Sequence, residues 1–278
     1  MRRYLEQRFD INSPGVASAL DEVPLWSAPF GMMLMERVRM RPKMTVLDVG
    51  CGTGFPILEL AQRLGDSCRL FGIDPWQMGI ERLAAKAGVY GLDYVAPIVG
   101  RAEEMPFKAG FFDLIISNNG LNNVQDQERV LTECSRTLRR GGQLVLTYNL
   151  PGTMDEFYEV FAMTSMEFGK KEWVARVQEH VLDKRKPLGW MKKTLFRTGF
   201  RIEDIRRRVF RIRYLDGSAL LHSFFIVQGF LDPWKKIVGR KELHKFFHLL
   251  ERNLNSVARE KGDFVLTIPM ACLDCAKR

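Results

Sequence analysis

The sequence has few cysteines and no long apolar run, and both shortages exclude classes of protein. Its five cysteines, at positions 51, 68, 134, 272 and 275, are odd in number and widely scattered, which argues against a disulfide scaffold and for a reducing compartment. The longest apolar run, ALLHSFFIVQGFL, is too short and too polar to cross a bilayer, and no apolar run follows the charged first residues. We therefore expect a soluble, cytoplasmic globular protein without a membrane span.

The first half of the chain has no net charge, whereas the second half has an excess of positive charge. Residues 1–150 hold 17 Lys and Arg against 17 Asp and Glu, whereas residues 151–278 hold 25 against 16 and so contain the whole net charge of +9. Such an excess suggests an acidic partner, although it is more often a solvated surface. Nucleic acid is therefore an alternative partner that charge alone does not favour.

Short β-branched runs alternate with amphipathic helical runs between residues 45 and 150. The expected strands are TVLDV, RLFGID, YVAPIV, FDLIIS and QLVLTYN. The expected helices are PILELAQRL, QMGIERLAAKAG and QERVLTECSRTLRR, with Gly141 and Gly142 as the stop of the last one. This alternation predicts an α/β fold with a doubly wound, Rossmann-like, mostly parallel sheet and helices on both faces. Such a sheet binds its ligand at the carboxyl ends of its strands.

The flanking segments are expected to elaborate this core. Residues 1–40 contain a turn and a methionine-rich helix, and we expect them to form an N-terminal helical lid. Residues 41–150 form the ligand-binding core. Residues 151–278 supply helices over 151–199, two helical stretches over 218–261, and the last two strands of the same sheet, RIEDIRRRVFRIRYLDG and DFVLTIPMACLDC.

The loop after the first strand has glycines at positions 50, 52 and 54. The dinucleotide fingerprint requires glycines at its first, third and sixth places, but the sixth place here is Phe55, so the pyrophosphate pattern fails. Three residues without Cβ still let a ligand lie directly against the main chain. Asp74 ends the second strand, where a carboxylate can accept hydrogen bonds from a ribose diol.

Four motifs follow one another in order: VLDVGCGTG, GIDPW, RAEEMPF and FDLIISN. As a set they resemble the class I S-adenosylmethionine (AdoMet)-dependent methyltransferases, particularly the ubiquinone and menaquinone C-methyltransferases with their arsenite and sterol methyltransferase relatives. The resemblance is close over residues 40–150 and looser over the last strands. It implies a seven-stranded sheet with an antiparallel last strand, AdoMet as cofactor, S-adenosylhomocysteine as product, and in-line methyl transfer to a carbon, oxygen or nitrogen atom of a small molecule.

The resemblance also implies which residues bind the cofactor. Asp48 would support the loop and the ammonium of AdoMet, Asp74 would hold the ribose hydroxyls, and Asn118 would meet the ammonium through its backbone or side chain. The glycines implied along the methionine portion are Gly50, Gly52 and Gly54, and the implied adenine neighbours are Pro75, Trp76, Met78, Ala102 and Glu103. Acceptor-side candidates, taken from family analogy and composition, are Trp26, Phe30, Asn119, Tyr148 and Asn149, with further aromatic candidates at Tyr4, Phe9, Phe157, Phe161 and Trp190.

Neither a catalytic residue nor a metal is indicated. A sulfonium leaving group is already activated, so the main task of the protein is to hold the acceptor close, aligned and dry. The four histidines lie outside the motifs, and Asn122 and Asn123 stand where many relatives have histidines. SNNG supplies no acidic metal ligands, and Cys272 and Cys275 face opposite sides of a strand without a second pair for zinc. We expect no metal.

Two alternatives remain open. The basic second half would suit an RNA or protein methyltransferase, although SNNG replaces the N-P-P-Y-like element used on flipped bases and glutamine amides. A non-methylating nucleotide-binding protein, such as an NAD(P)-dependent oxidoreductase, is the less favoured alternative. The acceptor and the oligomeric state cannot be read from the sequence.

Overall fold

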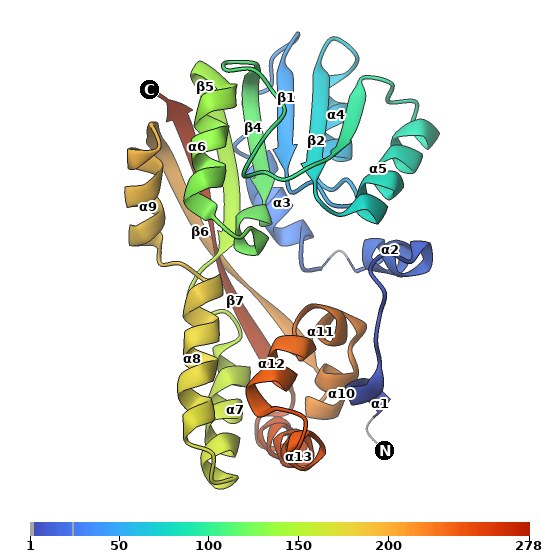
Figure 1. Cartoon of the computed structure of the whole chain (residues 1–278), viewed down its shortest axis with the longest axis vertical. Coiled ribbons are helices and arrows are strands. Elements are labelled where there is room, and N and C mark those ends of the chain that lie inside the picture. Colours follow the sequence, from blue (N-terminus) through green and yellow to red (C-terminus); the bar gives the residue numbers. More distant parts are fainter. Residues whose placement is uncertain (1–2, 24) are drawn as a thin grey trace. The chain divides into compact units, whose positions relative to one another are not determined.

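The computed structural model describes residues 3–23 and 25–278, which contain a seven-stranded mixed sheet flanked by helices (Figure 1). Its order is β3-β2-β1-β4-β5-β7-β6; neighbours among β1 to β5 are parallel, and β7 is antiparallel to β5. The predicted α/β fold with an antiparallel last strand is therefore confirmed. The strands are β1 (Thr45–Val49), β2 (Arg69–Asp74), β3 (Val95–Val99), β4 (Phe112–Asn118), β5 (Leu138–Asn149), β6 (Phe200–Tyr214) and β7 (Phe264–Lys277).

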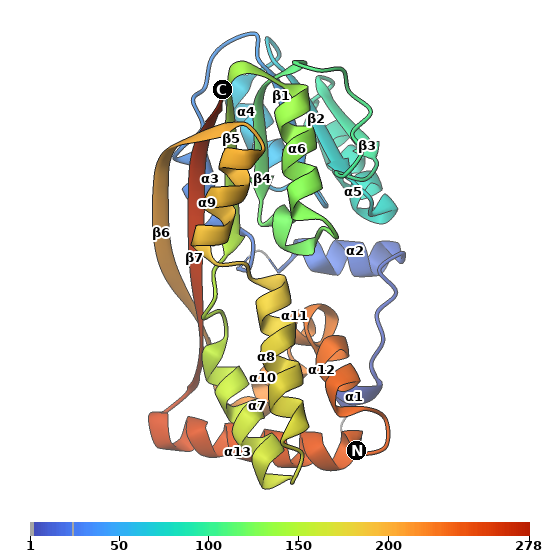
Figure 2. The same ribbon diagram turned by 60° about the vertical axis from the view of Figure 1, so that its left-hand side comes forward.

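Helices cover both faces of the sheet: α3 and α4 lie on one face, and α6 lies on the other (Figures 1 and 2). Burial on both faces explains why the central strands are nearly continuous apolar runs. None of the helices in the described residues is long and apolar enough to cross a bilayer. The helices are α1 (Arg3–Glu6), α2 (Pro14–Asp21), α3 (Ala28–Met35), α4 (Ile57–Leu64), α5 (Gln77–Val89), the 3₁₀ helix η1 (Gly120–Asn123), α6 (Gln127–Thr137), α7 (Asp155–Glu167), α8 (Glu172–Lys184), α9 (Leu188–Arg197), α10 (Gly217–His222), α11 (Phe224–Gly229), α12 (Leu231–Val238) and α13 (Leu243–Lys261).

The described residues form two compact units. The sheet unit comprises residues 11–149, 187–208 and 270–278, and the helical unit comprises residues up to 10, 150–186 and 209–269. Strands β6 and β7 each contribute residues to both units. The helical unit has an aromatic core in which Phe161 packs on Phe246 at a ring-centroid distance of 4.9 Å.

The predicted stop of the third core helix at Gly141 and Gly142 is wrong. Helix α6 ends at Thr137, and Leu138 already has an extended backbone with φ −77° and ψ 139°. The Leu138 side chain is fully buried, and the residue pairs with Phe112 in β4. Burial of this leucine in the sheet draws the chain out of the helix before it reaches the glycines.

The segment 218–261 forms four helices, α10 to α13, rather than the two helical stretches expected from its apolar periodicity. Ser223 has φ −60° and ψ 128°, which separates α10 from α11. Gly239 has φ +78°, a conformation that favours glycine, and it ends α12. Each break is a change of backbone conformation at one residue, and the periodicity of the apolar residues does not predict it.

Cys272 and Cys275 lie on β7 as free, buried thiols, like the other three cysteines. They pair with Thr147 and Leu144 of β5, three residues apart along that strand as well. Burial raises the pKa of Cys272 to about 12 and also raises that of Cys275, so both remain protonated at neutral pH. Their environment matches a packing role.

Candidate cofactor-binding site

The glycine loop leaves β1 with a backbone that requires glycine. Gly50, Gly52 and Gly54 have φ values of +76°, +50° and +110°. The Gly50 N–H donates to the carbonyl of Ile73 at 2.9 Å, which joins the loop to the end of β2. A Cβ on Gly52 would meet nothing within 4 Å, so this is the point where another molecule can approach the main chain.

Gly54 serves a different purpose from Gly52. A Cβ on Gly54 would come within 2.7 Å of Leu58 Cδ1 and 3.1 Å of Leu83 Cγ. The missing side chain therefore lets the first turn of α4 and helix α5 pack against the loop. The resemblance placed Gly54 along a bound ligand, whereas its Cβ direction points into the protein interior.

We expect Gly54→Ala to destabilise the protein by about 3 kcal/mol, because it combines overpacking against Leu58 with an unfavourable positive φ. Gly88→Ala is the matched control: Gly88 lies in helix α5, and a Cβ there would meet nothing within 4 Å. Alanine at position 88 should stabilise the protein by about 0.5–1 kcal/mol through helix propensity. Urea unfolding of both variants measures the difference, and equal midpoints would contradict the packing role of Gly54.

Asp74 ends β2 beside this loop. Its Oδ2 accepts the Gly52 N–H at 3.0 Å, and its Oδ1 accepts the Trp76 N–H at 2.9 Å. Each oxygen keeps a lone pair for a further donor. Burial raises the pKa of Asp74, and the two N–H groups partly offset that rise. The carboxylate is thus fixed in direction and still able to accept hydrogen bonds.

Asp48 lies within β1, fully buried. Neither of its carboxylate oxygens has a hydrogen-bond partner among residues 3–23 and 25–278. Burial and the charge of Asp74 raise the pKa of Asp48 to about 8. The nearby Ile57 N–H lowers this pKa by a small amount, although it is not placed to form a hydrogen bond with the carboxylate. A buried carboxyl group without partners is costly, which marks the place where a cation would be favourable.

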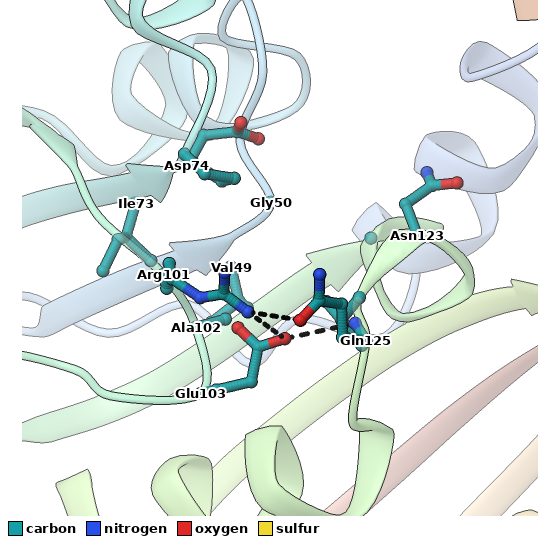
Figure 3. A pocket seen from close by; sticks show the side chains of 12 residues that line it. Val49, Gly50, Ile73, Asp74, Arg101, Ala102, Glu103, Asn123 and Gln125 are labelled. Atoms are coloured by element: carbon teal, nitrogen blue, oxygen red, sulfur yellow. Dashed lines mark hydrogen bonds and ion pairs between the residues drawn. The ribbon is translucent and has the colours of Figure 1, made fainter.

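A cavity of about 250 Å³ opens at the carboxyl ends of the first four strands (Figure 3). This is the edge at which doubly wound sheets bind their ligands. Its lining combines apolar and main-chain surface with two carboxylates, Asp74 and Glu103, and one cation, Arg101. The lining residues are Val49, Gly50, Ile73, Asp74, Pro75, Arg101, Ala102, Glu103, Gly120, Asn123, Val124 and Gln125.

Three of these residues form a polar rim (Figure 3). Arg101 Nη2 donates to Gln125 Oε1 at 2.9 Å and lies 3.6 Å from Glu103 Oε1. The same Glu103 oxygen accepts the Gln125 N–H at 3.1 Å. The rim joins the segment after β3 to the segment after η1, and it uses Glu103 Oε1 for contacts within the protein.

The structure brings part of the predicted cofactor set to the cavity wall. The Trp76 side chain contacts other parts of the protein. Its Nε1 donates to the Ile11 carbonyl at 2.8 Å, and its ring packs over Gly79. Asn118 uses its side chain within the protein, donating to the Ser27 carbonyl at 3.2 Å and accepting the Thr147 hydroxyl at 3.0 Å. The predicted residues that line the cavity are Gly50, Asp74, Pro75, Ala102 and Glu103, and those outside its lining are Asp48, Gly52, Gly54, Trp76, Met78 and Asn118.

The predicted acceptor-side residues of the sheet unit lie in three places. Asn119, Tyr148 and Asn149 are near the ends of β4 and β5, Trp26 and Phe30 are just before and on α3, and Trp190 is on α9. Asn119 has φ +59°, and both its Oδ1 and the Tyr148 hydroxyl are buried without a hydrogen-bond partner among the described residues. The Asn149 N–H donates to Asn122 Oδ1 at 3.2 Å. The rings of Trp26 and Phe30 lie 6.2 Å apart.

Sequence reasoning missed seven of the residues that line the cavity. Most are main-chain or apolar neighbours of motif residues, so the rule that ligands bind at strand ends would have found them. Gln125 lies in the segment LNNVQD, which belongs to none of the four motifs. The missed residues are Val49, Ile73, Arg101, Gly120, Asn123, Val124 and Gln125.

Comparisons with known proteins agree with this geometry. Residues 47–146 match the family model described as a methyltransferase domain. The demethylmenaquinone methyltransferase of Listeria welshimeri is 33% identical over 140 residues, which cover 49% of this chain and 59% of that protein. The nocamycin O-methyltransferase of Saccharothrix syringae is 32% identical over 123 residues, 44% of each chain. The chain thus spans less than two thirds of these relatives.

A solved structure, the YcgJ protein of Bacillus subtilis, superimposes with a TM-score of 0.59 at 17% identity, covering 90% of this chain and 97% of that one. At this identity the likeness shows the fold alone. The family match extends over β1, β2, β3, β4 and much of β5, which are the strands that carry the motifs. This match over residues 47–146 confirms the resemblance drawn from those motifs.

Proposed function

We propose that the chain is an AdoMet-dependent methyltransferase that methylates a small-molecule acceptor. The observation that supports this most is the pair of carboxylates at the glycine loop, Asp48 and Asp74, beside a cavity at the strand ends. Asp74 would accept hydrogen bonds from the ribose diol, and Asp48 would face the ammonium of the methionine portion. AdoMet carries its methyl group on a positively charged sulfur. This sulfur is a good leaving group without the help of a metal.

The charged residues of the cavity lining argue against a diphosphate there. A dinucleotide would place two negative charges near the carboxylate of Asp74, and among the described residues that line the cavity the one cation is Arg101. Arg101 is already engaged with Glu103 and Gln125. Repulsion between like charges would weaken the binding of a diphosphate in this cavity. An NAD(P)-dependent oxidoreductase is therefore the less favoured alternative.

The acceptor would lie near the ends of β4 and β5. Burial raises the pKa of the Tyr148 hydroxyl well above its usual range, so this group stays protonated and acts as a hydrogen-bond donor rather than a base. Asn119 Oδ1 would accept a hydrogen bond from the acceptor. Together they would orient the acceptor atom, which is the main task in displacement at a sulfonium.

A small molecule is a better acceptor candidate than RNA or protein. The matched relatives bear the names of demethylmenaquinone and nocamycin methyltransferases, both acting on small molecules. In addition, several arginines of β6 are paired with carboxylates, such as Arg206 with Asp204 and Arg208 with Glu36, each at 2.8 Å. Paired arginines are less available to phosphates than free ones.

Two measurements test the proposal. Calorimetric titration with AdoMet, S-adenosylhomocysteine and NAD should show binding of the first two only. Incubation with methyl-labelled AdoMet and a metabolite extract should then transfer the label to a small molecule. Binding of NAD alone, or label found only in RNA or protein, would contradict the proposal.

A further inference from the structure

The helical unit contains a buried arginine without an ionic partner. Arg185 follows the last residue of α8 and is 5% exposed. Its Nη1 has no hydrogen-bond partner among the described residues, and no ion pair is formed by its guanidinium within this part of the chain. Burying an unpaired charge destabilises a folded protein by several kcal/mol. A binding partner would remove that cost.

Two neutral hydrogen-bond donors accompany this arginine. The guanidinium carbon of Arg185 lies 5.5 Å from the ring centroid of Tyr158 on α7. The Tyr158 ring meets the Trp234 ring of α12 edge-on, with centroids 6.3 Å apart and planes at 89°. Tyr158 Oη and Trp234 Nε1 are both buried and, within the described residues, have no hydrogen-bond partner. We call Tyr158, Arg185 and Trp234 the Arg185 cluster.

The surroundings of the Arg185 cluster are apolar, with one acid and one histidine near enough to sense its charge. Phe157 stacks on Trp234 at a centroid distance of 4.0 Å. Burial raises the pKa of Asp155, and the nearby charge of Arg185 partly offsets this rise. Burial and the same charge lower the pKa of His180, so this histidine is neutral. The cluster therefore offers three donors and at most one net positive charge.

These properties define the chemistry of a ligand. A planar carboxylate matches the guanidinium fork, accepts from several donors at once, and needs only one positive charge. A phosphate dianion would need a second cation, and Asp155 would repel its two charges more strongly than the single charge of a carboxylate. Aromatic neighbours favour an apolar or aromatic body. We propose that the Arg185 cluster binds the carboxylate of an apolar or aromatic acid.

The position of Arg185 provides a route for entry. Its donor atom is closed to solvent, so the acid reaches the cluster only when the arginine side chain moves. Arg185 stands outside the helices, between the end of α8 at Lys184 and the start of α9 at Leu188. Its side chain can therefore move without unwinding a helix.

Calorimetry on the full chain without AdoMet tests the site directly. Benzoate and cinnamate are the probes, and benzamide and cinnamamide are their uncharged counterparts. The acids should bind at least about tenfold more tightly than the amides, and Arg185→Met should reduce acid affinity by about tenfold or more. Without ligand, this variant should melt no lower than the wild type, because it removes an unpaired buried charge.

Arg176→Met is the matched control. Arg176 is also on α8, but its Nη1 already has a hydrogen-bond partner, since it donates to the Ile237 carbonyl at 3.3 Å. Its replacement should leave benzoate affinity unchanged. Tyr158→Phe, which keeps the ring, provides a second test if Arg185→Met does not fold, and it should weaken acid binding by about threefold to tenfold.

Three outcomes would overturn the inference: no binding of either acid to the wild type, equal binding of acids and amides, or undiminished acid binding by Arg185→Met or Tyr158→Phe. A parallel titration with AdoMet separates this failure from failure of the proposed function. If AdoMet binds and the acids do not, only the Arg185 cluster is refuted. If the acids bind and AdoMet does not, the carboxylate site stands and only the proposed function is refuted.

Discussion

Asp74→Ala is expected to weaken AdoMet binding more than tenfold while the fold is retained. The substitution removes both carboxylate oxygens that would accept the ribose hydroxyls, and each hydrogen bond to a charged group contributes about 1.5–3 kcal/mol. It also releases the Gly52 N–H, which donates to Asp74 at 3.0 Å and holds the loop in place. Calorimetric titration with AdoMet measures the loss, and an unchanged dissociation constant would refute the ribose assignment.

Asp66→Ala is the matched control for this experiment. Asp66 is an exposed acid shortly before β2, at the opposite end of the strand that Asp74 terminates. Its removal changes the net charge by the same amount but leaves the strand end intact, so AdoMet affinity should stay within about twofold of the wild type. Asp74→Asn further separates charge from shape, because an amide keeps one acceptor oxygen. We expect its affinity to fall between those of the wild type and Asp74→Ala.

The sheet could be predicted from the sequence because its signals are local. The segment TVLDV forms β1 over Thr45–Val49 as its β-branched pattern predicts, and the glycine loop follows it directly. The end of α6 was mispredicted because burial of Leu138 against β4 decides it, and no neighbour in sequence signals this. Local patterning therefore gives the element types, and tertiary burial sets some of their ends.

The candidate site was only partly predictable for a similar reason. Asp74 and Ala102 lie in motifs, so their positions at strand ends followed from the order of elements. The rim pairing of Arg101 with Gln125 joins residues 24 positions apart, and no periodic pattern encodes it. The Arg185 cluster likewise brings together side chains from α7, α12 and the end of α8, and none of its members belongs to a motif.

Asp48→Asn is expected to abolish a proton release that accompanies AdoMet binding. In the free protein the pKa of Asp48 is about 8, so near pH 6.5 the carboxyl group is mostly protonated. A bound ammonium favours the ionised form, and binding should therefore release up to about one proton at this pH. Titrations in buffers with different ionisation enthalpies measure the number released. Adenosine, which lacks the ammonium, should release none.

The pH dependence of stability provides a second readout of the same group. The pKa of Asp48 in the folded protein, about 8, exceeds its ordinary value of 3.8, so the folded state holds a proton that the unfolded chain has lost between these values. The free energy of unfolding should therefore fall as pH rises through this window, by a total on the order of several kcal/mol from Asp48. Asparagine cannot titrate, so Asp48→Asn should lose less stability between about pH 5 and about pH 8 than the wild type. Parallel curves for the two proteins would show that Asp48 is already ionised in the folded chain, and the buried carboxyl group could then release no proton to a bound ammonium.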